Sequence, residues 1–246
     1  MSEIMRKKIV IIQSNYLPWR GYFDLLRQAD QVILFDSVQY TRRDWRNRNK
    51  IKTAEGATWL TIPVETKGKY LEAIDHIRVS DANWSDKHRR TIEMAYRRAP
   101  GFDDAAPWLF DALREAGSMS FLSAINEHLL RAIMERLGIK TALSRCTKFL
   151  DRAQMSEMSP TDRLIALCAA AGATEYLSGP AARSYLDEAK FHEANIAVNW
   201  MDYEGYPAYP QLWGEFQPFL SIVDIVARIG AGQAGHDRRE QPVAIG

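Results

Sequence analysis

The chain has 246 residues, of which 46% are hydrophobic and 26% charged, and this ordinary globular composition can supply a sizeable core. Its 32 Lys and Arg residues nearly balance 31 Asp and Glu residues, giving a net charge of +1. A dedicated DNA- or RNA-binding scaffold needs a large positive surplus, so the balance argues against that class. It leaves room for a local basic site.

The remaining bulk features predict a cytoplasmic protein. Cys146 and Cys168 lie far apart and outside any CxxC spacing, which favours reduced thiols over a disulfide framework. The apolar run at residues 9–12 is too short for a signal peptide, and no run approaches the ~20 apolar residues of a spanning helix.

Several familiar motifs are missing from the sequence. The five histidines show neither HxxxH nor HExxH spacing, so no zinc site is expected. GxGxxG, GxxxxGK[ST] and GxSxG are also missing, which disfavours a Rossmann dehydrogenase, a P-loop ATPase and an α/β-hydrolase.

The N-terminal region predicts a βαβ unit. A β-branched run at residues 8–13 is typical of a buried strand. Residues 14–18 break it, apolar residues then recur at helical spacing over 19–29, and a second buried-strand run covers 31–36. Strand, loop, helix and strand within about thirty residues indicate an α/β fold with a doubly wound, mostly parallel sheet.

The rest of the chain alternates between the two patterns. Pro63 marks one predicted strand as an edge strand. The pattern predicts strands at 58–64, 141–144, 175–177 and 196–200, and helices at 83–98, 105–116, 119–137, 163–171 and 219–229. We therefore expect one domain over residues 1–235, with a helical insertion at about 80–140 and a disordered tail at 236–246.

A first cluster of candidate site residues follows the first predicted strand, where ligands bind in doubly wound sheets. Gln13 and Asn15 offer amide groups, and unpaired amides are costly to bury without a partner. Tyr16, Trp19 and Tyr22 offer flat faces with polar edges for binding a substrate. The alternative is an aromatic-rich helix start that packs under the sheet.

A second cluster begins where the second predicted strand ends. Asp36 can bind a ribose hydroxyl, a metal or a substrate amine, or act as a base, and Gln39 and Tyr40 follow it closely. We expect these three side chains beside the first cluster, because the carboxyl ends of parallel strands meet at one edge of a sheet.

The basic segment at residues 41–52 can hold an anion. Arg48 and Lys52 would share one face if the segment were helical. A solvated basic loop is the competing interpretation, and Arg42 and Arg43 are assigned to plain surface. The candidates for the anion site are Arg46, Asn47, Arg48 and Lys52.

Two weaker clusters lie towards the C-terminus. Ser178 and Gly179 form a turn between a strand and a helix start, whose amides favour negative charge. Tyr209 and Gln211 lie in a proline-rich extended segment that leads to Asp224. This Asp has apolar neighbours and needs a partner, such as an Arg or backbone amides of the basic segment, and a structural pair competes with catalysis.

Five segments, in order, resemble the WbqC-like family of bacterial proteins. Two positions depart from that family: Ser14 stands where a Pro is usual, and Tyr206 stands where a His is expected, so no histidine role carries over. The segments are QSNYLPWRGYFDLL, ADQVILFDSVQYTRRDWRNRNKI, WLTIPV, YLSGPAARSYL and YPQLWGEFQPFLSIVDIVARIG.

The resemblance implies a role in O-antigen, lipopolysaccharide or other surface polysaccharide biosynthesis. A glycine-type aminoacyl transferase role is suggested for some members, which means amide formation between an amino acid and a nucleotide-linked amino sugar. Asp36 would be the base. The developing oxyanion would be stabilised either by the cations that also bind phosphate or carboxylate, Arg46, Arg48 and Lys52, or by the Ser178–Gly179 amides. A tRNA is a partner only if the donor is an aminoacyl-tRNA; otherwise the expected partners are small molecules, with neither DNA nor a membrane.

A fainter likeness is to nucleotidylyltransferases, which implies a similar Rossmann-like, nucleotide-binding fold. YLPWRGYF is placed like their PFHxGH loop, with Trp19 and Tyr22 instead of the two histidines, and YLSGPAARSYL is placed like their ISGxxIR turn. The first alternative is therefore a nucleotidylyl- or adenylyl-transfer enzyme that uses ATP and Mg²⁺. The second alternative is a non-catalytic nucleotide-sugar-binding protein.

Overall fold

The computed structural model describes residues 6–69 and 71–234, and the chain divides into two compact units. The first unit comprises the residues up to 13, 24–37 and 141–204, and the second comprises 14–23, 38–140 and the residues from 205 onwards. The expected single domain with a helical insertion stays a prediction, and the expected tail at 236–246 lies outside the described residues.

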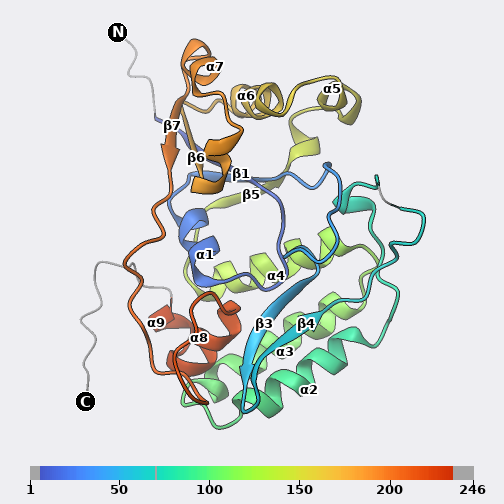
Figure 1. Cartoon of the computed structure of the whole chain (residues 1–246), viewed down its shortest axis with the longest axis vertical. Helices are drawn as coiled ribbons and strands as arrows, with labels where there is room; N and C mark the ends of the chain where they lie inside the picture. The colour runs from blue at the N-terminus through green and yellow to red at the C-terminus, as the bar shows by residue number, and fades with distance from the viewer. Residues whose placement is uncertain (1–5, 70, 235–246) are drawn as a thin grey trace. The chain divides into compact units, whose positions relative to one another are not determined.

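The first unit contains a five-stranded parallel sheet in the order β5-β2-β1-β6-β7 (Figure 1). The chain runs from β1 outwards to β2 and β5, then returns to the other side of β1 for β6 and β7. The order therefore reverses between β1 and β6, which is the topological switch point of a doubly wound sheet. This arrangement confirms the predicted α/β class. The strands are β1 (Lys8–Ile12), β2 (Gln31–Leu34), β5 (Ala142–Arg145), β6 (Glu175–Ser178) and β7 (Ala197–Trp200).

Short helices complete the first unit. Helix α6 (Pro160–Ala170) covers most of the helix predicted at 163–171 and begins three residues earlier. The Ser159 hydroxyl accepts the Asp162 N–H at 3.2 Å and Pro160 occupies the first turn, which fixes this start. Helix α1 (Arg20–Arg27) begins in the second unit and ends in the first. The 3₁₀ turn η3 (Pro180–Ser184) follows Gly179, where the sequence predicted a helix start. The sequence pattern did not predict α5 (Arg152–Ser156), α7 (Glu188–Glu193) or the 3₁₀ turn η2 (Cys146–Lys148).

The second unit combines a β-hairpin with helices. Its hairpin consists of β3 (Arg48–Thr53) and β4 (Gly56–Thr61), and β3 packs against α2 (Figure 1). A φ of 110° at Gly56 suits the turn between the strands, because glycine tolerates that conformation. The helices are α2 (Trp84–Tyr96), α3 (Phe102–Gly117), α4 (Leu122–Arg136), α8 (Ile222–Ile229), α9 (Ala231–Ala234) and the 3₁₀ turn η1 (Ile74–His76).

The helical interpretation of the basic segment is wrong, because residues 48–53 form β3. Arg48 and Lys52 still share a face, since alternate side chains of a strand point the same way. The intervening Asn49 and Ile51 are buried. The hydrophobic period of two is hard to see in the sequence, because only one of the inward positions carries an apolar side chain.

A buried aromatic cluster closes the hairpin side of the second unit. Tyr16 is fully buried and its hydroxyl donates to Nδ1 of His88 at 2.7 Å. Nε2 of His88 then donates to the Thr61 carbonyl at 3.2 Å, and the indole of Trp84 meets Tyr16 edge-on. Burial lowers the pKa of His88 from 6.5 to about 4. The histidine therefore stays neutral in the folded protein.

Replacing His88 by Gln should flatten the pH dependence of stability. The pKa of His88 is lower in the folded chain than in the unfolded chain, so its neutral form contributes stability above pH 6.5 that is lost as pH falls towards 4. Wild type should lose roughly 3 kcal/mol more than His88→Gln over that window. Urea unfolding at several pH values measures this difference. His76→Gln, which removes a more exposed imidazole, is the control, and equal slopes for wild type and His88→Gln would contradict the assignment.

Candidate functional site

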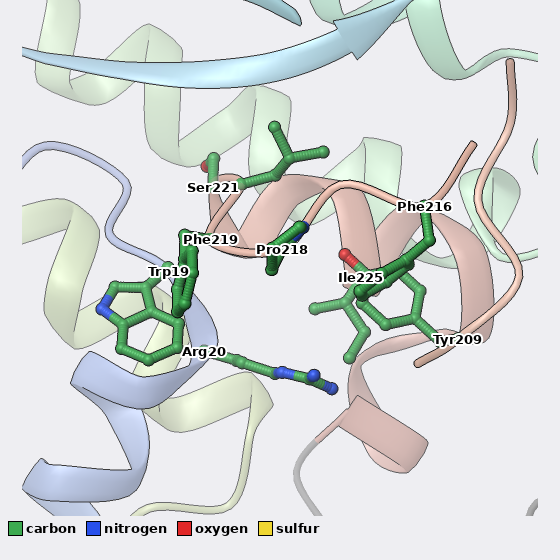
Figure 2. Close-up of a pocket in the computed structure, with 9 residues that line it drawn as sticks. Trp19, Arg20, Tyr209, Phe216, Pro218, Phe219, Ser221 and Ile225 are labelled. Carbon is green, nitrogen blue, oxygen red and sulfur yellow. The ribbon is translucent and has the colours of Figure 1, made fainter. Parts of the chain in front are cut away.

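The second unit contains a pocket with aromatic walls (Figure 2). Trp19 and Phe219 lie together at one side, Tyr209 and Phe216 lie at the other, and the Arg20 side chain extends between them (Figure 2). Ring centres of Trp19 and Phe219 are 5.0 Å apart, and those of Tyr209 and Phe216 are 5.4 Å apart, both with edge-to-face geometry. These rings present apolar faces on which part of a ligand can pack.

Arg20 brings a positive charge into this pocket. Its guanidinium donates to the Pro207 carbonyl at 2.8 Å. The guanidinium carbon lies 4.5 Å from the ring centre of Tyr206 and 5.4 Å from that of Tyr209, within cation–π range. A guanidinium positioned over two rings can bind a carboxylate or phosphate.

The backbone around the pocket is unusual. An added Cβ at Gly21 would lie 2.3 Å from the Trp19 ring, so glycine is what lets that indole fold back over the helix start. Phe219, Trp213 and Leu17 have positive φ angles of 62°, 66° and 39°. Each such residue costs of the order of 1–3 kcal/mol, and strain of this kind clusters at functional sites.

A hydrogen-bonded network lies behind Tyr209 and centres on Asp224, which is 1% exposed. One carboxylate oxygen accepts the Tyr96 hydroxyl at 2.7 Å, and the other accepts the Tyr209 hydroxyl at 2.6 Å. The Tyr96 oxygen in turn accepts the backbone N–H of Lys52 at 2.9 Å. The expected partners of Asp224, an Arg or backbone amides, are therefore wrong: two tyrosine hydroxyls take that role.

Lys52 extends the same network from β3. Its ammonium group is held by the Gln211 side-chain oxygen at 3.0 Å and by the carbonyl of Glu215. Gln211 also donates to the Tyr209 hydroxyl at 3.1 Å. Lys52, Gln211, Tyr209 and Asp224, each predicted to be a site residue, are thus brought together in the structure.

Burial and neighbouring groups shift the pKa values of two members of this network. Burial raises the pKa of Asp224, although the two hydroxyls and the Lys52 charge act in the opposite direction. Burial and the adjacent Asp224 charge raise the pKa of Tyr209 well above its ordinary value. Tyr209 is therefore a neutral hydroxyl that lines the pocket and is hydrogen-bonded to a carboxylate of increased basicity.

A second group of predicted residues lies on the hairpin and the loop beside it. The Arg46 guanidinium donates to the Asn15 side-chain oxygen and lies 3.6 Å from Asp44. The Arg48 guanidinium stacks on Trp59, 4.1 Å from the ring centre. Asn47, by contrast, is buried and donates to the Ile62 carbonyl at 2.8 Å.

The first unit holds four of the predicted residues at one edge of its sheet. Gln13 directly follows β1, Asp36 lies two residues beyond β2, and Ser178 ends β6 with Gly179 after it. Asp36 is 3% exposed. Their common position at the carboxyl ends of neighbouring parallel strands agrees with the placement expected from the sequence, while their chemical roles stay predictions.

Other predicted residues have mainly structural contacts. Tyr22 is buried against Phe23, with ring centres 6.0 Å apart. Tyr40 is also buried, and its backbone N–H donates to Glu72. Gln39 is exposed in a β-bridge to Ala73.

The structure also identifies residues that sequence reasoning missed. Arg20 adjoins Trp19, and its position inside an aromatic run was an available signal. Tyr96 lies on a helix with an ordinary amphipathic pattern, so nothing in the local sequence distinguishes it as a site residue. Phe219 is 62% exposed, and the sequence gives no sign of its left-handed backbone conformation.

Two absences concern only the described part of the chain. Residues 6–69 and 71–234 contain no group of three or more His, Cys, Asp or Glu side chains placed to hold a metal ion. Among the helices of the same residues, none is long and apolar enough to cross a membrane.

Comparisons with known proteins place the chain among uncharacterised relatives. The model of the WbqC-like protein family matches residues 13–235. The chain is 45% identical over 225 residues to the uncharacterized protein Rv1507c of Mycobacterium tuberculosis, a match that covers 92% of this chain and 95% of the relative. No solved structure matches the chain.

Removing the Asp224 carboxylate should destabilise the second unit. Asp224→Ala leaves the Tyr96 and Tyr209 hydroxyls without their acceptor, which should reduce the free energy of unfolding by about 2–5 kcal/mol. Asp224→Asn keeps an acceptor oxygen and the side-chain shape, so it should cost clearly less. Urea unfolding of both variants, with the exposed Asp111→Asn as control, measures the difference. Equal stability of the wild type and Asp224→Ala would contradict the network.

Proposed function

The chain belongs to the WbqC-like protein family, and we propose that it is a transferase that joins an activated amino acid to the amine of a nucleotide-linked amino sugar in surface-polysaccharide assembly. The amine nitrogen would attack the acyl carbon of the donor. A C–N bond forms, the C–O bond to the leaving group breaks, and the amine proton passes through the enzyme to the leaving oxygen.

The observation that carries this proposal is the pairing of the pocket with the proton-transfer network. Tyr209 belongs to both: its ring lines the pocket, and its hydroxyl donates to Asp224 at 2.6 Å. A hydroxyl so placed can take a proton from an attacking amine while it passes its own proton to the carboxylate. Burial raises the pKa of Asp224, which makes its carboxylate a better proton acceptor for Tyr209.

The pocket also offers the two binding surfaces that this reaction needs. The Trp19 and Phe219 rings can pack on the apolar face of a sugar. Arg20 can hold a phosphate or carboxylate of the substrate. Asp36, the base predicted from the sequence, belongs to the first unit and is the alternative base to be tested beside Tyr209.

Tyr209→Phe should lower kcat and leave KM nearly unchanged, because the ring that lines the pocket remains and only the hydroxyl is lost. Acid–base catalysis contributes about 100-fold or more, so a decrease of that size is expected. The activity of the wild type should also fall at acidic pH, because Asp224 must be ionised to accept the proton. Mass spectrometry of the aminoacylated sugar nucleotide gives the rates. Full activity of Tyr209→Phe, together with inactive Asp36→Asn, would move the base to Asp36.

Arg20→Ala should weaken substrate binding. Loss of a charge-assisted hydrogen bond costs about 1.5–3 kcal/mol, which corresponds to roughly 10- to 100-fold in Kd. Titration calorimetry with UDP- and dTDP-linked amino sugars measures the affinity, and exposed Arg114→Ala is the matched control. Wild-type protein that binds none of these sugars would refute the proposed substrate class.

A second candidate function rests on the sheet of the first unit. Its strand order reverses between β1 and β6, and Gln13 and Ser178 lie at the carboxyl ends of those strands. Nucleotides commonly bind at such switch points, which favours nucleotidylyl or adenylyl transfer. Magnesium-dependent ATP binding with release of pyrophosphate would support this alternative over the first.

A further inference from the structure

The β3–β4 hairpin and the loop before it carry a strip of aromatic and cationic side chains, defined as Trp45, Arg48, Lys50 and Trp59. Trp45 and Trp59 are 43% and 38% exposed, although tryptophan is usually largely buried. Their ring centres lie 5.5 Å apart. The Lys50 ammonium lies 4.9 Å from the Trp59 ring centre, and Arg48 stacks on the same ring.

The strand geometry fixes the spacing of the positive charges. Arg48, Lys50 and Lys52 occupy alternate positions of β3, so their Cα atoms are about 6.8 Å apart along one face. Lys50 lies directly opposite Trp59 in the register. Lys52 is buried and hydrogen-bonded, so Arg48 and Lys50 are the cations that face a ligand. Two cations at this spacing beside stacking rings match a ligand with repeating phosphates and flat bases.

The strip also has unused hydrogen-bonding capacity. Among the described residues, the Nε–H groups of Arg48 and of neighbouring Arg46 find no acceptor. A buried donor without an acceptor is costly, so both guanidinium groups are held at some energetic cost beside the strip. The Asp44 carboxylate lies 3.6 Å from the Arg46 guanidinium and offsets part of the positive charge there. The local charge therefore stays positive although the whole chain has a net charge of only +1.

One end of the strip leads to the pocket. The face of β3 that carries Arg48 and Lys50 continues to Lys52, whose ammonium is bound by Gln211 at 3.0 Å. Gln211 donates to the hydroxyl of Tyr209, which lines the pocket. Hydrogen bonds through the buried Lys52 and Gln211 thus connect β3 to the group proposed to move the proton.

We propose that the strip binds the single-stranded 3′ end of an RNA that carries the amino acid as an ester, so that an aminoacyl-RNA is the donor. This inference rests on the proposed function. The sugar amine attacks the ester carbonyl carbon, a C–N bond forms, and the C–O bond to the terminal ribose breaks. The amine proton ends on the released ribose hydroxyl, and no further reactant is needed.

The extent of the strip favours RNA over a nucleotide sugar as its ligand. A nucleotide sugar presents one base and one diphosphate, which a single ring and a single cation can hold. The strip offers two exposed rings and cations at successive alternate positions. This repeat is the pattern by which proteins follow a single strand, stacking several bases in turn.

The test is the binding of a fluorescein-labelled single-stranded RNA of about eight nucleotides, followed by anisotropy. Trp59→Ala should weaken binding at least about fivefold, because a stacked base is lost. Arg48→Ala/Lys50→Ala should lower the slope of log affinity against log salt by about 1.4, which is the value for two phosphate contacts on a single strand.

Matched variants control for charge and exposure. Phe121→Ala removes an exposed ring that also carries a cation, since Arg78 lies 4.8 Å from its centre. Lys87→Ala/Arg114→Ala removes two positive charges from α2 and α3. Both should bind RNA like the wild type. Circular dichroism and melting temperature establish that each variant is folded.

The outcomes separate this inference from the proposed function. Wild-type protein that binds UDP- or dTDP-amino sugars but no RNA overturns the RNA donor and leaves the transferase intact. Strip variants that bind RNA as tightly as wild type also overturn it. The sugar nucleotide and RNA could also compete for Trp59. Both would then quench the same indole fluorescence, and Trp59→Ala would remove that quenching. This result would assign the strip to the sugar nucleotide instead.

Discussion

A carboxylate that is removed from water must find hydrogen-bond donors inside the protein, and Asp224 meets this constraint in a way that organises the second unit. Its two tyrosine partners come from α2 and from the proline-rich segment before α8. Tyr96 also accepts a backbone N–H of β3, so helix, strand and C-terminal segment converge on one side chain. Because Tyr209 is oriented by this carboxylate, the wall of the pocket is fixed by the same interaction that holds the unit together.

The pocket and the hairpin strip share a physical theme, which is the pairing of guanidinium or ammonium groups with aromatic faces. Arg20 lies over Tyr206, and Arg48 lies over Trp59. A cation held this way keeps its charge available while its position is restricted. Binding of an anion therefore costs less side-chain entropy, because the cation is already ordered. Tyr206 occupies the position where a histidine is expected from the family, and in this chain it serves as such a face.

The sequence was most informative where one signal dominates. Runs of buried aliphatic residues predicted the parallel sheet, and Asp224 was recognisable because a carboxylate between Val223 and Ile225 demands a partner. The partner itself was not predictable: Tyr96 lies 128 residues away, and no local pattern points to it. The strand β3 was missed because its inward positions include a polar Asn49, which hides the alternation. The pocket depends on left-handed backbone at bulky residues, which residue preferences argue against.

The order of the segments along the chain has a consequence for biosynthesis. The second unit is assembled from residues 14–23, 38–140 and those from 205 onwards, so its network joins parts of the chain that the ribosome delivers at very different times. Contacts of such long sequence separation form late, because loop closure has to precede them. A nascent chain that ends before α8 holds Tyr96 without its carboxylate and Arg20 without its pocket. The pocket and its network are therefore complete only once the residues up to α8 have been synthesised.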